Sequence, residues 1–132
     1  MSFKRRMEIP LANFRSFLQK IICCQIPLRY INKVYFPHPV GIVIGSETEI
    51  GSNVTIYQNA TIGHLEVSHN MSGSYSVICD NVTIFLGAVI AGRITIGSNV
   101  IIGAKAVVTQ SISENSSVVG YNQVKSREDM QW

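Results

Sequence analysis

The stretch from Ile78 to Ser113 reads ICDNVT IFLGAV IAGRIT IGSNVI IGAKAV VTQSIS, six hexapeptides in one unbroken frame. The same repeat runs upstream from Ile44 to Gly63 and breaks at His64, and every first position in both runs is isoleucine or valine. The fifth position is small or β-branched throughout: Thr48, Val54, Ala60, Val82, Ala88, Ile94, Val100, Ala106 and Ile112. A period of six matches neither the 3.6-residue period of a helix nor the alternation of a simple strand. It predicts a short strand and a tight turn, repeated along the chain.

Stacked units of this kind would bury one continuous apolar column and pair their strands in parallel. Glycine and asparagine supply the turn conformations at low cost. They recur at the second position (Gly45, Gly51, Gly63, Gly97, Gly103) and at the fourth (Asn53, Asn59, Asn81, Asn99). We therefore predict an all-β fold, a parallel solenoid. A β-sandwich, with turn signals about every 8 to 12 residues, does not fit this spacing.

The composition bounds the remaining possibilities. The chain has 132 residues, of which 46% are hydrophobic and 14% charged, which excludes intrinsic disorder and suits one domain. No uninterrupted apolar run reaches the length of about 18 residues that a membrane-spanning helix needs. The three cysteines, two of them adjacent at Cys23 and Cys24, make no disulfide framework. A reducing compartment is the simpler inference, so we expect a cytoplasmic protein.

Three segments are predicted. Residues 1–36 hold a short amphipathic α-helix, with apolar residues at helical spacing between Leu11 and Ile22, and a lead-in. Residues 37–120 form the solenoid, with an excursion loop at 64–77 where the frame breaks. Residues 121–132 form a tail.

Charge divides the chain unevenly. Residues 1–33 carry seven basic groups against one acidic group, whereas the rest carries four basic and seven acidic groups. The basic helix suits contact with an anionic membrane surface, and a solvated helix face suits the same pattern. The body has no basic stripe or aromatic platform, so we expect no nucleic-acid partner.

The segment from Phe36 to Gly45, FPHPVGIVIG, resembles the HPxGIVIG segment of the serine acetyltransferase branch of the hexapeptide-repeat acyltransferases. The resemblance runs from about Ile26 to Lys125. It implies a left-handed parallel β-helix, a homotrimer, and an O-acetyltransferase that uses acetyl-CoA as co-substrate.

Two departures from that branch bear on the acceptor. Cys23 and Cys24 stand near the place of an orienting aspartate, and the run from Ser74 to Ser76 stands where a second histidine is found. These departures argue against L-serine more than against acetyl transfer. We therefore expect a sugar or glycan acceptor, with serine O-acetylation as the alternative.

His38 is the candidate catalytic residue. It lies six residues before Ile44, so the bare frame would point it into the core, but Pro37 and Pro39 flank it and locally override the frame. The residues alone leave both orientations open. The resemblance implies that His38 is the general base, removing the acceptor's hydroxyl proton in a direct transfer without an acyl-enzyme. Neutral imidazole suits that task near pH 7.

The resemblance also implies the binding residues. Acetyl-CoA would contact Leu86, Gly87, Ala104, Lys105 and Lys125. The acceptor would contact loop residues, for which we take His64, Glu66, His69 and Tyr75.

Two other functions stay open. His38, His64 and His69 could give a zinc site of the kind found in γ-type carbonic anhydrases, which share this repeat. The two loop histidines break the hexad frame, so we expect no metal. A catalytically inactive binding solenoid is the other alternative. It is suggested by the missing aspartate that would orient the histidine, and by Phe85-Leu86, which stands where the family usually has a glycine and a small residue.

Overall fold

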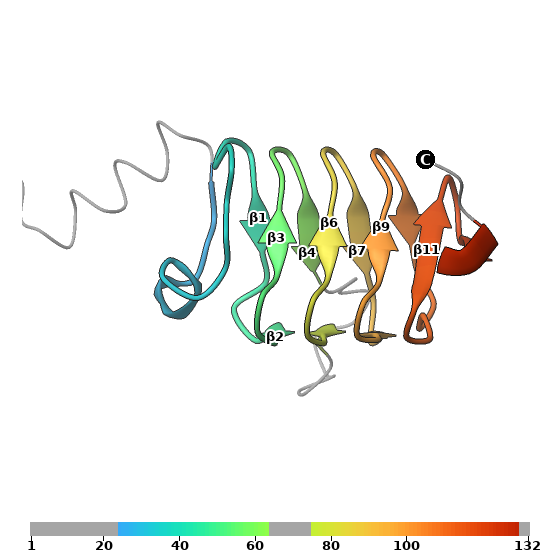
Figure 1. The fold of residues 1–132 in the computed structure, drawn as a ribbon. Coiled ribbons are helices and arrows are strands. Elements are labelled where there is room, and N and C mark those ends of the chain that lie inside the picture. The colour runs from blue at the N-terminus through green and yellow to red at the C-terminus, as the bar shows by residue number, and fades with distance from the viewer. Residues whose placement is uncertain (1–23, 64–74, 130–132) are drawn as a thin grey trace, which may run out of the picture.

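A computed structural model of the chain describes residues 24–63 and 75–129. The described chain is nearly all β-structure (Figure 1). Its elements are η1 (Leu28–Tyr30), β1 (Val43–Ile44), β2 (Glu49–Ile50), β3 (Thr55–Ile56), β4 (Thr61–Gly63), β5 (Val77–Ile78), β6 (Thr83–Ile84), β7 (Val89–Ala91), β8 (Thr95–Ile96), β9 (Ile101–Ile102), β10 (Val107–Val108), β11 (Ser116–Val119), β12 (Gln123–Ser126) and η2 (Arg127–Asp129).

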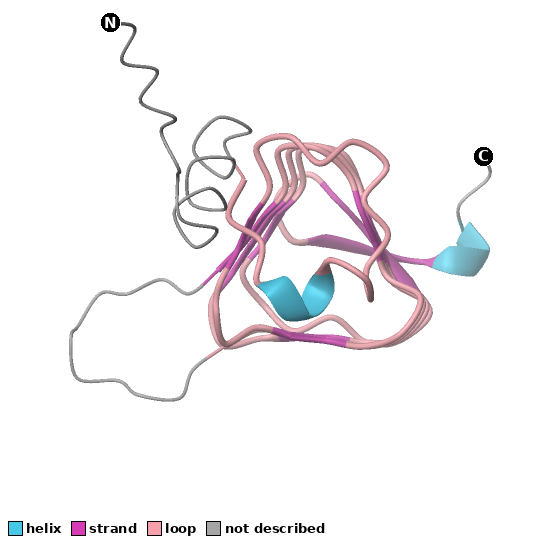
Figure 2. Ribbon diagram, turned by 90° about the vertical axis from the view of Figure 1, so that its left-hand side faces the viewer, coloured by secondary structure: helices cyan, strands magenta, loops and turns pink. Residues whose placement is uncertain are grey.

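The strands form three sheets around a triangular prism, which Figure 2 shows along its axis. One sheet has the order β1-β4-β7-β10, the second β2-β5-β8, and the third β12-β11-β9-β6-β3. All pairs are parallel except β11 with β12. The predicted parallel solenoid of hexads is therefore confirmed, with one strand per hexad and three hexads per turn.

Strand register gives the length of each coil. Val77 pairs with Thr95, eighteen residues later, as three hexads require. Glu49, however, pairs with Val77, twenty-eight residues later, so the coil that contains residues 64–74 has ten extra residues. These residues fall in the sequence between β4, in the first sheet, and β5, in the second. The register on either side of the insertion is unchanged.

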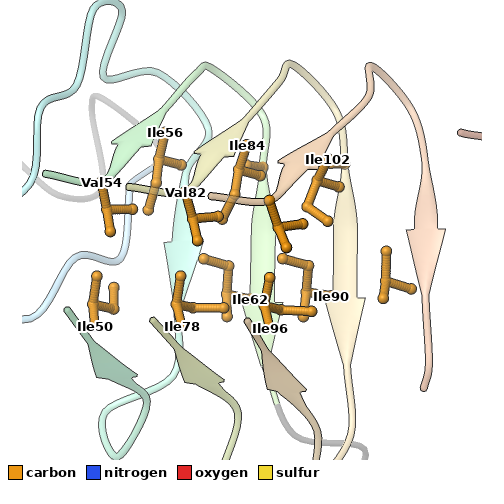
Figure 3. Packing of buried hydrophobic residues seen from close by; sticks show 14 of the residues in the cluster. Ile50, Val54, Ile56, Ile62, Ile78, Val82, Ile84, Ile90, Ile96 and Ile102 are labelled. Carbon is orange, nitrogen blue, oxygen red and sulfur yellow. The ribbon is translucent and has the colours of Figure 1, made fainter. Parts of the chain in front are cut away.

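The first-position residues of the hexads fill the prism (Figure 3). None of the ten, Ile44, Ile50, Ile56, Ile62, Ile78, Ile84, Ile90, Ile96, Ile102 and Val108, is more than 4% exposed. Small fifth-position residues such as Ala60, Ala88 and Ala106 are completely buried where the backbone turns. Burial of this continuous column, at about 25 cal/mol per Å² of apolar area, is the main source of stability.

Side chains and a hairpin cover the two ends of the prism. At the N-terminal end, residues of η1 and the turn after it donate to backbone carbonyls in and just before β2: Arg29 to Ser46 and Thr48, Tyr30 to Thr48, and Lys33 to Ile50. At the other end, β12 folds back antiparallel along β11. These devices satisfy strand edges that would otherwise be open to a second chain.

Strand pairing begins earlier and ends later than residues 37–120. Gln25 bridges Val43 and Tyr35 bridges Thr55, while Ser126 pairs with Ser116. The predicted helix between Leu11 and Ile22 lies outside the described residues. Within the described part of the chain, no helix is long and apolar enough to cross a membrane.

Candidate active site

A change of frame places His38 on the surface. His38 lies eighteen residues before Ile56, which would put it under that core residue. The observed bridge instead joins Tyr35 to Thr55, twenty residues apart, so Phe36 takes the position under Ile56. Phe36 packs against the core, whereas His38 is exposed. The inward orientation that the bare repeat allowed is therefore excluded.

The displacement is a local insertion of two residues. Val40 accepts a hydrogen bond from the backbone N–H of Asn59, so the eighteen-residue register has returned by Gly41. Three residues, Pro37 to Pro39, thus occupy the space that Tyr57 alone fills in the next coil. The prolines fix their own φ angles and have no N–H to offer to the ladder. They make this insertion compatible with the fold and place His38 outside the core.

Four successive coils each contribute one turn to the corner between the third sheet and the first. We call it the His38 corner (residues 37–41, 57–59, 85–87 and 103–105). Backbone N–H groups link it along the prism axis: Asn59 donates to Val40, Gly87 to Gln58, and Lys105 to Leu86. These contacts are 2.8 to 3.0 Å long. One continuous ladder therefore runs from the His38 turn to Lys105.

The residues at the tip of this corner all adopt the left-handed conformation. Their φ angles are +64° at Gly41, +59° at Asn59, +66° at Gly87 and +56° at Lys105. Glycine and asparagine take this conformation readily, but for lysine it costs free energy. Lys105 is thus the strained member of the column, and its side chain is exposed.

Aromatic rings line the third-sheet side of the corner. Tyr57 and Phe85 stack with their ring centroids 5.1 Å apart and their planes 11° from parallel. The equivalent residue one coil further on is Gly103. Leu86, beside Phe85, is 38% exposed, and Val40 is 53% exposed. The corner therefore presents an apolar surface next to its polar backbone ladder.

The structure brings together His38 and four of the five predicted acetyl-CoA contacts. Leu86, Gly87, Ala104 and Lys105 lie on the His38 corner, two and three coils away from the histidine. Lys125 lies apart from them on β12, where it pairs with Ser117 and is exposed.

Of the predicted acceptor residues, the structure describes only Tyr75, which does not lie on this corner. Tyr75 is partly exposed and lies two residues before Val77, the first residue of β5. His64, Glu66 and His69 lie outside the described residues. In the described ranges 24–63 and 75–129, no group of three metal-ligating side chains is found. The zinc alternative depends on the two loop histidines, so it stays untested.

Cys24 and Asn59 contact the His38 turn directly, and sequence reasoning missed both. The Cys24 thiol donates to the carbonyl of Pro39 over 3.0 Å, and a side-chain oxygen of Asn59 lies against Gly41. The repeat contained a signal for each. Cys24 precedes Ile42 by one coil of eighteen residues, and Asn59 stands in the same relation to Gly41.

This arrangement can carry acid–base chemistry. An exposed imidazole is held on a turn whose neighbouring backbone is hydrogen-bonded, beside a corner with apolar and polar surfaces. A histidine so placed can accept a proton from a bound hydroxyl group.

Comparison with known proteins agrees with the repeat. The family model described as bacterial transferase hexapeptide (six repeats) matches residues 73–110. The chain is 44% identical over 88 residues to the serine acetyltransferase of Staphylococcus aureus strain Mu50, an alignment that covers 67% of this chain and 40% of the relative. The chain thus spans well under half of the length of the curated relatives it matches.

Solved serine acetyltransferases have the same fold. Isoform 3 from Entamoeba histolytica, in complex with cysteine, superposes with a TM-score of 0.65 at 31% identity, covering 79% of this chain and 37% of that one. A serine acetyltransferase in complex with CoA gives a TM-score of 0.57 at 27% identity, covering 74% and 40%. The repeat and these matches place the solenoid on the serine acetyltransferase-like branch of the hexapeptide-repeat transferases, and its prism is the left-handed parallel β-helix of that branch.

Proposed function

We propose that the chain is an acetyl-CoA-dependent O-acetyltransferase with His38 as its general base. The observation that supports this proposal is the two-residue insertion between Phe36 and Gly41. It turns His38 outward at the same corner as Leu86, Gly87, Ala104 and Lys105. A related enzyme solved with CoA supports the co-substrate.

The reaction needs one base and one oxyanion donor. The neutral imidazole of His38 takes the proton of the acceptor hydroxyl while the oxygen attacks the thioester carbonyl. Backbone N–H groups can stabilise the oxyanion of the tetrahedral intermediate. When the C–S bond breaks, the imidazolium returns its proton to the CoA sulfur, so the products are an acetyl ester and free CoA.

L-Serine is the acceptor that we propose first, because the relatives at 43 to 44% identity are named serine acetyltransferases. This replaces the sugar or glycan hydroxyl that the missing carboxylate had favoured. The change at residues 74–76 and the cysteine pair at 23 and 24 are then differences within an enzyme of the same chemistry.

We also propose that a homotrimer forms the complete site. His38 and Tyr75, the first described residue after the segment 64–74, lie at different corners of the prism in one chain. A cleft lined by both would have to be formed by two subunits, with His38 from one and Tyr75 and the 64–77 loop from its neighbour.

Release of free CoA from acetyl-CoA tests the proposal. The purified chain is assayed with L-serine, and separately with a panel of sugars and nucleotide sugars. We expect turnover with L-serine, and a loss of at least about 100-fold in kcat for His38→Ala, the typical contribution of a general base. Glu114→Gln is the control, because Glu114 is exposed and lies between β10 and β11, outside the His38 corner, and this variant should keep full activity. Turnover with sugars alone would overturn the acceptor, and full activity of His38→Ala would overturn the base.

A further inference from the structure

The turn that carries His38 has few ways to be held. Pro37 and Pro39 have no backbone N–H, so neither can donate to the neighbouring coil. His38 and Val40 accept hydrogen bonds from Val40 and Asn59 respectively, both 2.8 Å long. The carbonyl of Pro39, directly after the histidine, finds its partner outside the repeat.

That partner is a thiol. Cys24 Sγ lies 3.0 Å from the carbonyl oxygen of Pro39 and 3.4 Å from the backbone nitrogen of Ile42. The thiol therefore donates to one end of the turn and accepts from the other, which closes a bridge across the four residues from Pro39 to Ile42.

Cys24 is itself held in place. Gln25, next to it, donates to Ile42 over 2.7 Å and accepts from Ile44 over 2.8 Å, as a strand of the first sheet would. The cysteine is half-buried and packs against the hydrophobic core. Its thiol thus links a position fixed in the first sheet to the one carbonyl group of the turn, that of Pro39, for which the backbone ladder gives no partner.

We propose that Cys24 is a positioning residue that holds the His38 turn through this thiol bridge. The inference rests on the proposed function, because positioning has an effect on rate only if His38 acts on substrate. Loss of a hydrogen bond of ordinary strength costs about 1 kcal/mol, or about fivefold in rate if the whole loss is felt in the transition state.

Three variants separate positioning from folding. In Cys24→Ala, kcat falls about three- to tenfold, while KM for acetyl-CoA and for L-serine changes less than twofold, because the thiol touches neither substrate. Cys24→Ser keeps a donor and an acceptor, and restores kcat to within about twofold of the original. Cys79→Ala removes the other described free thiol, at a different corner, and leaves kcat unchanged. The rates refer to folded protein, verified by circular dichroism.

Amide hydrogen exchange gives a second readout that needs no activity. In Cys24→Ala the amides of Val40, Ile42 and Asn59 exchange faster than in the unmodified chain and in Cys79→Ala. Unchanged exchange would overturn the bridge itself. Faster exchange with an unchanged kcat would overturn the positioning role. A chain with no acetyl transfer to any acceptor would overturn the proposed function and this role together, and exchange would then report a structural bridge alone.

Discussion

Asn59 occupies the space that a side chain on Gly41 would need. The backbone N–H of Asn59 donates to Val40, and its Oδ1 lies 2.2 Å from the position of a Cβ atom built on Gly41. Gly41 also has a φ of +64°, which L-residues with a Cβ adopt at a cost. This contact determines where the chain returns to the eighteen-residue register after the two-residue insertion at His38.

Gly41→Ala should therefore destabilise the chain by about 2 kcal/mol or more, since it combines backbone strain with a steric clash. Urea unfolding measures the loss. Gly63→Ala is the matched control, because a Cβ there meets no atom of the described residues within 4 Å and should leave stability nearly unchanged. In the double variant Gly41→Ala with Asn59→Gly, the clash is gone and part of the loss should return. Equal stability of Gly41→Ala and Gly63→Ala would contradict the contact.

Lys105 gives a prediction in which stability and activity change in opposite directions. Its φ of +56° suits glycine better, so Lys105→Gly should raise the free energy of unfolding by about 1 kcal/mol. If its ammonium group binds acetyl-CoA, the same variant should raise KM for acetyl-CoA several-fold and leave KM for L-serine unchanged. Denaturant unfolding and initial rates test the two effects separately. An unchanged KM for acetyl-CoA would remove Lys105 from the binding site.

The asparagines of a second corner form hydrogen-bonded pairs. Asn53 Nδ2 donates to Asn81 Oδ1 over 2.8 Å, and both residues are left-handed, with φ of 54° and 56°. Asn81→Ala should cost about 2 kcal/mol, because it loses both the bond and the conformational tolerance. Asn81→Gly keeps the tolerance and should cost under about 1 kcal/mol. Thermal unfolding distinguishes them, and an alanine variant as stable as the glycine variant would contradict the conformational part.

The N-terminal cover of the prism depends on a buried hydroxyl group. Tyr30 is 4% exposed, and its hydroxyl donates to the carbonyl of Thr48. Tyr30→Phe should cost about 1 kcal/mol rather than more, because Arg29 also donates to that carbonyl over 3.1 Å. Tyr35→Phe, on a side chain that is 67% exposed, is the control and should be neutral. Identical unfolding midpoints for the two variants would show that this cover does not stabilise the chain.

The repeat made the prism predictable, because the spacing of Ile44, Ile50 and Ile56 determines one strand per hexad and leaves little choice of packing. The orientation of His38 was not predictable from the same count. It depends on two compensating changes within one coil. The part between Gln25 and Tyr35 is two residues shorter than its successor, and the part between Tyr35 and Gly41 is two residues longer.

The site was predictable only in part. Leu86 and Lys105 share a corner because they are nineteen residues apart, almost one coil, which the frame already implies. The spacing of eighteen residues places Cys24 beside Ile42, but the repeat gives no sign of the thiol's hydrogen bond to Pro39, which lies in the two-residue insertion. His64, Glu66 and His69 stay predictions, since the excursion follows no repeat.

A crystal structure of the chain with CoA bound tests the central claim most directly. We predict that the pantetheine arm follows the corner from Lys105 and Leu86 toward His38, and that the sulfur lies within hydrogen-bonding reach of the imidazole, directly or through one water. CoA bound at another corner, or a His38 ring enclosed beneath Ile56, would contradict it.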